Sequence, residues 1–228
     1  FLVQSAYVIP SVVKKDFQID TTGRTGPVVI DVPKDMTDPN HKFEYKYPSS
    51  VYLRSYPILG ESDANEVKEA VKLLKSAKKP VIYAGGGVIQ ADASEELIQL
   101  SRMIGCPVTN TLMGLGAFPS TDDQFIGMLG MHGTYEANMV MSEADLIFNA
   151  GARFDDRITN NPKKFGIAAK KIHIDSDPSS IDKIINVDVA LQGDAKIVLG
   201  QICEEFKNAS YDKSNLEPWW KQVKEWRN

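Results

Sequence analysis

The stretch "DLIFNAGARFDDR", residues 145–157, decides the fold. Its first half is a short apolar run, which is typical of a strand buried on both faces of a parallel sheet. Its second half turns at Gly151 and continues with two aspartates between two arginines. Ligands of parallel α/β sheets bind beyond the carboxyl ends of the strands. The stretch therefore predicts an α/β fold with a ligand site directly after this strand.

The same alternation of strand and helix continues on both sides of this stretch. Further strands are expected at residues 80–84, 106–110, 171–175 and 187–191. Helices are expected after Asp63, whose spacing to Glu66 suits a capping box, at residues 94–104 and 135–142, near Ile181, and after Asp194. Strands separated by helices predict a doubly wound parallel sheet covered by helices on both faces.

A domain boundary is predicted upstream of this series. The run "PVVIDV", residues 27–32, has the composition of another buried parallel strand. Residues 36–60 follow it without periodicity, and the segment is longer than a normal loop within a domain. We therefore expect residues 1–35 to end a first domain, 36–60 to be a linker, 61–207 to form a second domain, and 208–228 to lead onward as a linker helix.

Composition and charge exclude several classes of protein. The net charge is −4 with acids and bases mixed along the chain, which argues against a nucleic-acid partner. The uncharged run at residues 103–121 is broken by prolines and glycines, so it does not predict a membrane span. Cys106 and Cys203 form no C-x-x-C motif, which argues against a zinc site or a disulfide framework. The sequence shows no signal-peptide pattern, and because it begins at Phe1 rather than Met we expect it to be an internal piece of a longer protein.

Five successive strand ends carry glycine or acidic residues. They are "AGGGV" (84–88), "TLMGLG" (111–116), "GARFDDR" (151–157), "DSDP" (175–178) and "QGDA" (192–195). Glycine permits close backbone approach, fresh helix N-termini attract phosphate, and an acid at a strand end can bind ribose hydroxyls. Together they predict an extended nucleotide along one edge of the sheet. The segment "GMLGMHG" (127–133) would add His132 and Met131 as contacts to a flat ring.

Each of these features also has an ordinary structural interpretation. Gly85, Gly86 and Gly87 lack the G-x-G-x-x-G spacing and suit a plain turn. Asp175 can cap a helix. The methionines in these segments can fill a core. Arg153 and Arg157 can form a surface ion-pair cluster with the aspartates between them.

Several blocks, in order along the chain, resemble the catalytic subunit of acetohydroxyacid synthase, also called acetolactate synthase. The blocks are "GRTGPVVIDVPKD" (23–35), "TLMGLGAFP" (111–119), "GMLGMHG" (127–133), "GARFDDRIT" (151–159) and "IHIDSDP" (172–178). The resemblance implies a thiamine-diphosphate enzyme of three α/β domains that decarboxylates pyruvate and joins it to a second 2-ketoacid in branched-chain amino-acid biosynthesis. This chain would supply the end of the pyrimidine-binding first domain and the FAD-binding middle domain.

The resemblance also implies cofactors, partners and location. FAD would be bound by this chain, whereas thiamine diphosphate and Mg²⁺ would be bound mainly outside it, so no metal ligand is expected here and the isolated chain should be inactive. Partners would be 2-ketoacids, the flanking domains, further copies of the chain in a homo-oligomer and a regulatory subunit, with no nucleic acid and no membrane. The location would be the bacterial cytoplasm, with an organelle left open because the chain starts at Phe1.

The family's functional residues map onto matching positions of this sequence. Arg24 would reach the flavin, and Lys34 would stand at the mouth of the substrate channel. Met131, Asp156 and Arg157 would surround the second ketoacid. The remaining positions would bind FAD: Gly85, Gly86, Gly87, Thr111, Leu112, Met113, Gly130, His132, Gly151, Arg153 and Asp155, with Asp175, Gly193 and Asp194 at the adenosine end.

Two other functions stay open from the sequence. One is the same domain in another enzyme, either an NAD- or FAD-dependent oxidoreductase or a thiamine-diphosphate enzyme of the oxalyl-CoA or glyoxylate class. The other is a nucleotide-binding module without catalysis. The tail is a separate question, since Trp219, Val223 and Trp226 fall on one helical face. We expect that helix to be exposed in this chain as the start of a linker; the alternative is that it folds back on the domain.

Overall fold

The computed structural model describes residues 1–40, 42–54, 56, 58, 60–208 and 210–227. The chain divides into two compact units, Phe1–Ile58 and Leu59–Asn228, which are described separately. None of the helices in the described part of the chain is both long enough and apolar enough to cross a membrane. The assignment of residues 36–60 as an interdomain linker stays a prediction.

The first unit contains one α-helix that was not expected from the sequence, α1 (Ile9–Thr21), preceded by the 3-10 helix η1 (Ala6–Val8). The expected strand at residues 27–32 is wrong. Among the described residues, its backbone pairs with residues 1–3: Asp31 N donates to Phe1 O at 2.8 Å, and Val3 N donates to Asp31 O at 2.9 Å. Val29 is 75% exposed. The two segments therefore form a single parallel bridge, from Leu2 to Asp31, instead of a strand pair.

The second unit is built on a six-stranded parallel sheet, so the predicted fold class is confirmed. The strands are β1 (Pro80–Ala84), β2 (Val108–Asn110), β3 (Phe125–Met128), β4 (Leu146–Ala150), β5 (Lys170–Asp175) and β6 (Val189–Gln192). Their order is β3-β2-β1-β4-β5-β6. The order reverses between β1 and β4, which is the switch point where such sheets bind ligands.

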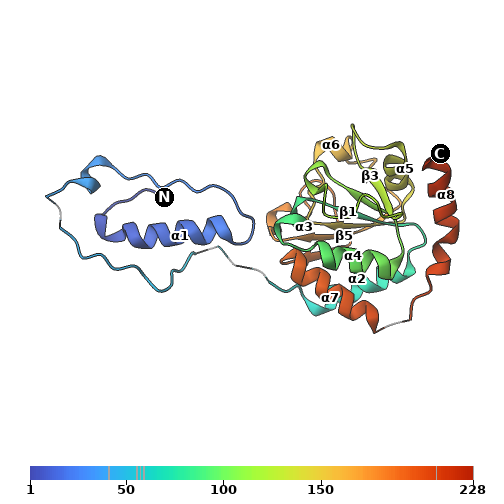
Figure 1. Ribbon diagram of the computed structural model, residues 1–228, viewed down its shortest axis with the longest axis horizontal. Coiled ribbons are helices and arrows are strands. Elements are labelled where there is room, and N and C mark those ends of the chain that lie inside the picture. Colours follow the sequence, from blue (N-terminus) through green and yellow to red (C-terminus); the bar gives the residue numbers. More distant parts are fainter. Residues whose placement is uncertain (41, 55, 57, 59, 209, 228) are drawn as a thin grey trace. The chain divides into compact units, whose positions relative to one another are not determined.

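Helices cover both faces of this sheet (Figure 1). One face carries α2 (Ala64–Ser76), α3 (Gly86–Gln90), α4 (Ser94–Ile104) and α7 (Ala195–Lys207), and the other carries α5 (Tyr135–Glu143) and α8 (Glu217–Arg227). The short elements are α6 (Asp156–Thr159) and the 3-10 helices η2 (Lys34–Thr37), η3 (Leu112–Gly114), η4 (Pro178–Ser180) and η5 (Lys213–Leu216). The helix expected near Ile181 is only η4, because Ile181 is already extended and Asp182 adopts φ 57°.

Local sequence signals fix the helix ends. Asp63 accepts the N–H groups of Asn65 and Glu66 at 2.8 and 3.4 Å and so starts α2. Asp194 starts α7 in the same way. Gly105 ends α4 in the left-handed conformation at φ 81°, which glycine adopts without the strain that a Cβ would add.

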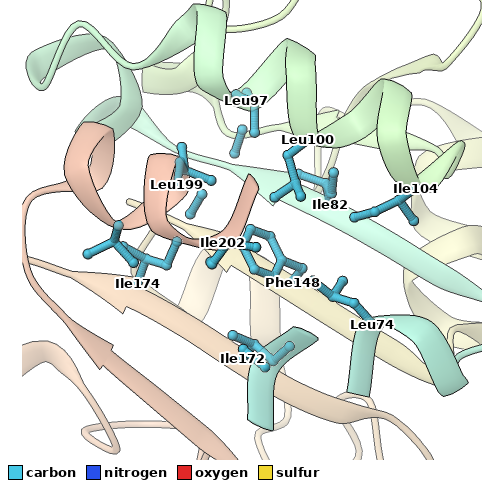
Figure 2. Packing of buried hydrophobic residues seen from close by; sticks show 14 of the residues in the cluster. Leu74, Ile82, Leu97, Leu100, Ile104, Phe148, Ile172, Ile174, Leu199 and Ile202 are labelled. Carbon is cyan, nitrogen blue, oxygen red and sulfur yellow. The ribbon is translucent and has the colours of Figure 1, made fainter. Parts of the chain in front are cut away.

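The larger core lies between the sheet and the face covered by α2, α4 and α7. Figure 2 shows Leu97 and Leu100 of α4 and Ile202 of α7 pointing toward Phe148 at the centre of β4. All of them are fully buried. Each such side chain contributes roughly 1.5–3 kcal/mol when removed from water. This core makes the sheet a rigid support for the loops at its carboxyl edge.

The C-terminal helix α8 packs on the second unit, so the prediction that it is exposed is wrong. Trp219 is 1% exposed, and its Nε1 donates to the Pro80 carbonyl oxygen at 3.1 Å. The reason lies in the sheet. In the β1–β2 register, Ile82 lies opposite Val108 and its N–H donates to the Pro107 carbonyl. Pro80 lies two residues before Ile82, and in the same register its carbonyl oxygen would accept a hydrogen bond from the nitrogen of Pro107. That nitrogen carries no hydrogen, so the ladder bond cannot form. The indole supplies the missing donor.

Candidate functional site

The carboxyl edge of the sheet brings together the site residues that the sequence analysis placed in the second unit. Each strand is followed by one group: Gly85–Gly87 after β1, Thr111–Met113 after β2, Gly130–His132 after β3, Gly151, Arg153 and Asp155 after β4, Asp175 at the end of β5, and Gly193 with Asp194 after β6. Because all six strands run in parallel, these groups share one edge.

The groups touch one another around the switch point. A Cβ added to Gly85 would lie 2.3 Å from the Gly151 carbonyl oxygen, and one added to Gly87 would lie 2.8 Å from Gly151 Cα. Gly87 N donates to Gly151 O at 3.0 Å. A Cβ added to Gly114 would likewise lie 2.5 Å from the Ala84 carbonyl oxygen. Glycine is therefore required here so that neighbouring loops can pack backbone against backbone, a role that the sequence analysis had given to a ligand.

The contact continues to the other end of the sheet. Gly151 N donates to Ile174 O at 3.0 Å, and Gly193 N donates to Asp175 O at 3.2 Å. Gly193 packs tightly as well, since a Cβ there would lie 2.7 Å from the Gly60 carbonyl oxygen. The loops after β1, β2, β4, β5 and β6 thus form one continuous surface.

Three polar site residues at this edge hold their own loops. The first carboxylate oxygen of Asp155 accepts Arg157 N at 3.1 Å, and that of Asp175 accepts Asp177 N at 2.8 Å. The Thr111 hydroxyl accepts Gly114 N at 2.8 Å. Asp155 and Thr111 thereby cap α6 and η3. The interpretation of Asp175 as a helix cap is wrong, because Asp177 caps η4 and Asp175 closes the turn before it. These hydrogen bonds use one oxygen of each carboxylate and leave the second oxygen for another partner.

Exposed apolar side chains and cations border the same edge. Met113 and Met131 are both 76% exposed, so the interpretation of these two as core filler is wrong. Leu112, next to Met113 in the sequence, is 68% exposed. Arg153 and Arg157 are exposed, and neither makes an ion pair with any described residue, so the ion-pair interpretation is not seen. The edge offers flat apolar contacts and positive charge to a ligand.

The loop after β3 lies against α6. A Cβ on Gly130 would come 2.7 Å from Ile158 Cδ1 and 3.3 Å from the Arg157 carbonyl oxygen. Gly130 itself adopts φ 108°, and the Asn138 side chain holds both its N–H and its carbonyl, at 3.2 and 3.1 Å. The loop that carries Met131 and His132 is therefore held next to the segment that carries Arg157.

A small cavity of about 60 Å³ opens between the loops after β4 and β5. Its lining residues are Arg153, Phe154, Asp155, Ser180, Lys183, Ile184 and Ile185. Ligand pockets for whole cofactors measure about 300–1,000 Å³. This cavity can hold only part of a dinucleotide, and the rest would lie along the open edge.

A buried polar row that the sequence analysis missed runs directly beneath the edge. Tyr83 lies opposite Thr109 on one side and Asn149 on the other, and Asn149 lies opposite His173. All four are at most 1% exposed and share the sheet face opposite the aliphatic core. The signal in the sequence was a polar or aromatic-polar residue within an apolar run, one position before the strand end in "VIYA" and "LIFNA" and two positions before it in "IHID".

Two members of the row are satisfied and two are not. Thr109 donates to Gly127 O at 2.9 Å, and Asn149 bonds both the carbonyl and the N–H of Ala152. The Tyr83 hydroxyl and both His173 ring nitrogens have no hydrogen-bond partner among the described residues. Burial, with a smaller contribution from the Asp155 carboxylate, raises the pKa of the Tyr83 phenol well above its usual 10, so it stays protonated as a donor.

The other predicted site residues lie in the first unit, and neither a reactive thiol nor a metal cluster is found at this edge among the described residues. Arg24 and Lys34 are exposed residues of the first unit. Burial raises the pKa of Cys106 to about 12 and that of Cys203 to about 11, so both thiols stay protonated and unreactive. Within the described ranges, no three His, Cys, Asp or Glu side chains are placed to hold a metal ion.

Comparison with known proteins identifies the class. Residues 67–202 match the family model "Thiamine pyrophosphate enzyme, central domain", and the chain therefore belongs to the thiamine pyrophosphate enzyme family. An acetolactate synthase large subunit from Haemophilus influenzae is 50% identical over 232 residues, which cover 100% of this chain and 40% of that protein. The isozyme 3 large subunit from Escherichia coli is 46% identical, again over 100% of this chain and 40% of the relative.

Solved structures show the same fold. The X-ray structure of a protein from Mycobacterium smegmatis, described as a thiamin diphosphate-dependent enzyme, superposes with a TM-score of 0.71 at 20% identity. The superposition covers 93% of this chain and 40% of that one. The chain thus spans less than half the length of these relatives.

Proposed function

We propose that this chain is the central part of an acetolactate synthase large subunit and that the carboxyl edge of its sheet binds FAD. The full protein would decarboxylate pyruvate and join the product to a second 2-ketoacid. The observation that carries the proposal is that the residues of the second unit expected to bind FAD lie together on one continuous edge of the sheet. In addition, the whole of this chain aligns with an acetolactate synthase large subunit at 50% identity.

The chemistry of the edge fits the cofactor. Exposed Met113 and Met131 suit a flat isoalloxazine ring. Arg153 and the nearby Lys183 supply positive charge for a diphosphate. The carboxylates of Asp155 and Asp175, each of which uses one oxygen to hold its own loop, suit ribitol and ribose hydroxyls. The open edge agrees with partial enclosure by neighbouring domains in the full protein.

The segment around α6 would position the second ketoacid. Arg157 is an exposed permanent cation with a two-pronged donor, which matches a carboxylate. Met131 would provide an apolar wall, since its loop is held against α6. Asp156 and Lys34 would complete the substrate channel. Thiamine diphosphate, with Mg²⁺ outside this chain, supplies the carbon nucleophile when bound. FAD has a structural role in this proposal, and the protein would work in the cytoplasm as a homo-oligomer with a regulatory subunit.

Equilibrium dialysis of the purified 228-residue chain against FAD, with NAD in a parallel series, tests the proposal. We expect FAD to be retained weakly and NAD not at all. Circular dichroism provides the control that the chain is folded. A folded chain that retains no FAD at any concentration contradicts the FAD site, and stronger retention of NAD favours an oxidoreductase domain.

A second measurement separates the chain from the full protein. The chain alone should form no acetolactate from pyruvate, because the residues that bind thiamine diphosphate are expected outside it. Thiamine-dependent turnover by a pure sample of the chain would contradict its role as one part of a larger catalytic subunit.

A further inference from the structure

His173 is a buried imidazole that none of the assigned roles uses. It lies in the middle of β5, 1% exposed, two residues before Asp175. Because side chains alternate along a strand, both residues point to the same face of the sheet. A histidine with neither ring nitrogen hydrogen-bonded is costly to bury and calls for a partner.

The Asp175 carboxylate is the charged group that faces the His173 ring. His173 Nε2 lies 3.7 Å from Asp175 Oδ2, and the Asp175 side chain is 12% exposed. This distance exceeds a hydrogen bond by about 0.8 Å. The other oxygen, Oδ1, accepts Asp177 N at 2.8 Å, and the main-chain carbonyl of Asp175 accepts Gly193 N. With the main chain of Asp175 held in this way, a movement of Oδ2 by about 0.8 Å toward Nε2 would close the gap to hydrogen-bond distance.

The imidazole ring is itself held in place. The Phe154 ring meets it edge to face, with centroids 5.3 Å apart and planes at 69°. Phe154 belongs to the loop after β4, between Arg153 and Asp155. His173 therefore links the loop that would bind the diphosphate to the acid that would bind the adenosine.

We propose that His173 donates a hydrogen bond from Nε2 to Asp175 Oδ2 and so orients this carboxylate toward the ribose hydroxyls of a bound adenine dinucleotide. His173 is thus a positioning residue that acts through Asp175. The ribose part of this role rests on the FAD site proposed above, whereas the contact between the two side chains does not.

Three substitutions of His173 separate positioning from packing. His173→Gln places an amide nitrogen near the position of Nε2 and should keep FAD affinity within about threefold. His173→Asn mimics only Nδ1, and His173→Phe keeps the ring packing without any donor. Both should raise the FAD Kd about tenfold, the loss expected for one hydrogen bond to a charged group. In the Asp175→Asn background, His173→Phe should produce no further loss.

Two readouts do not depend on FAD. Nitrogen NMR of the labelled chain should show a proton on His173 Nε2, and Asp175→Asn should shift this resonance. Thermal unfolding of His173→Phe and His173→Asn without FAD provides the control that each variant is folded at the temperature of the binding assay.

Each outcome decides one of the two claims. Wild-type affinity in both His173→Phe and His173→Asn, or an unprotonated Nε2 in the wild type, overturns the positioning role. If the folded wild type retains no FAD while the Nε2 proton depends on Asp175, the FAD site and the ribose role are wrong, and the contact between His173 and Asp175 stands.

Discussion

Replacing Trp219 tests the docking of α8, a feature of the fold that was predicted wrongly from the sequence. Trp219→Phe keeps an aromatic ring in the site but removes the indole N–H that bonds the Pro80 carbonyl oxygen at 3.1 Å. No ladder donor can replace it, because the residue that would face this carbonyl on β2 is Pro107. The substitution therefore leaves a buried carbonyl unsatisfied.

The expected cost follows from these contacts. An unsatisfied buried acceptor costs about 1–3 kcal/mol. The smaller phenyl ring also loses part of the contact with the Trp226 ring, whose centroid lies 5.7 Å from that of Trp219. Trp219→Ala should cost about 3–5 kcal/mol, as large aromatic truncations in cores do. We expect Trp219→Phe to lower the free energy of unfolding by about 2 kcal/mol, within that first range.

Urea unfolding followed by circular dichroism measures this cost, with Trp226→Phe as the matched control. Trp226 is only half-buried, and no hydrogen bond from its indole is found among the described residues. The control should cost less than about 1 kcal/mol. Tryptophan fluorescence of the wild type should be blue-shifted and resistant to quenching at monomer concentrations. Equal costs for the two substitutions, with a red-shifted signal, would show that α8 is undocked in solution.

Three further predictions concern the sheet edge, acid stability and substrate binding. Gly85→Ala should lower the free energy of unfolding, measured in urea, by about 1–3 kcal/mol, because the added Cβ would collide with backbone atoms. The control Gly200→Ala should not lower it, because the space around Gly200 is open. Burial raises the pKa of Asp188, but hydrogen bonds from the lysine pair that begins β5 outweigh burial and lower this pKa below 3.8. The wild type should therefore be more stable than Asp188→Asn above pH 3.8, and this difference in the free energy of unfolding should disappear as the pH falls further. In the full enzyme, Arg157→Lys should slow carboligation with the second ketoacid about 10–100-fold and affect the first decarboxylation less, as loss of a charge-assisted two-pronged contact predicts; equal losses would mean that Arg157 is structural.

The sheet was largely predictable because its central strands are uniform apolar runs. Residues 80–84 and 146–150 are buried on both faces, and such runs have few alternatives when helical patterns separate them. The edge strand β3 was missed because Gly127 adopts φ 85° within it and the register against β2 shifts. No regular alternation marks an irregular edge of this kind.

The interpretation of the site from sequence was limited by contacts that pattern does not show. The sequence indicated that Gly85 and Gly151 matter, but not that they face each other across the switch point. It showed an amphipathic tail with Trp219, but not the carbonyl on β1 that lacks a ladder partner. His173 went unused because its importance depends on the cross-strand register, which places it beneath the edge.

Mapping FAD onto the labelled chain by NMR tests the central claim most directly. With FAD added, amide shifts should concentrate at the carboxyl edge, in residues 85–87, 111–113, 130–132, 151–155, 175 and 193–194. Amides at the opposite edge, such as Lys79 and Gly105, should not move. Shifts confined to that opposite edge, or scattered over the surface of a folded chain, would contradict an FAD site at the carboxyl ends of the strands.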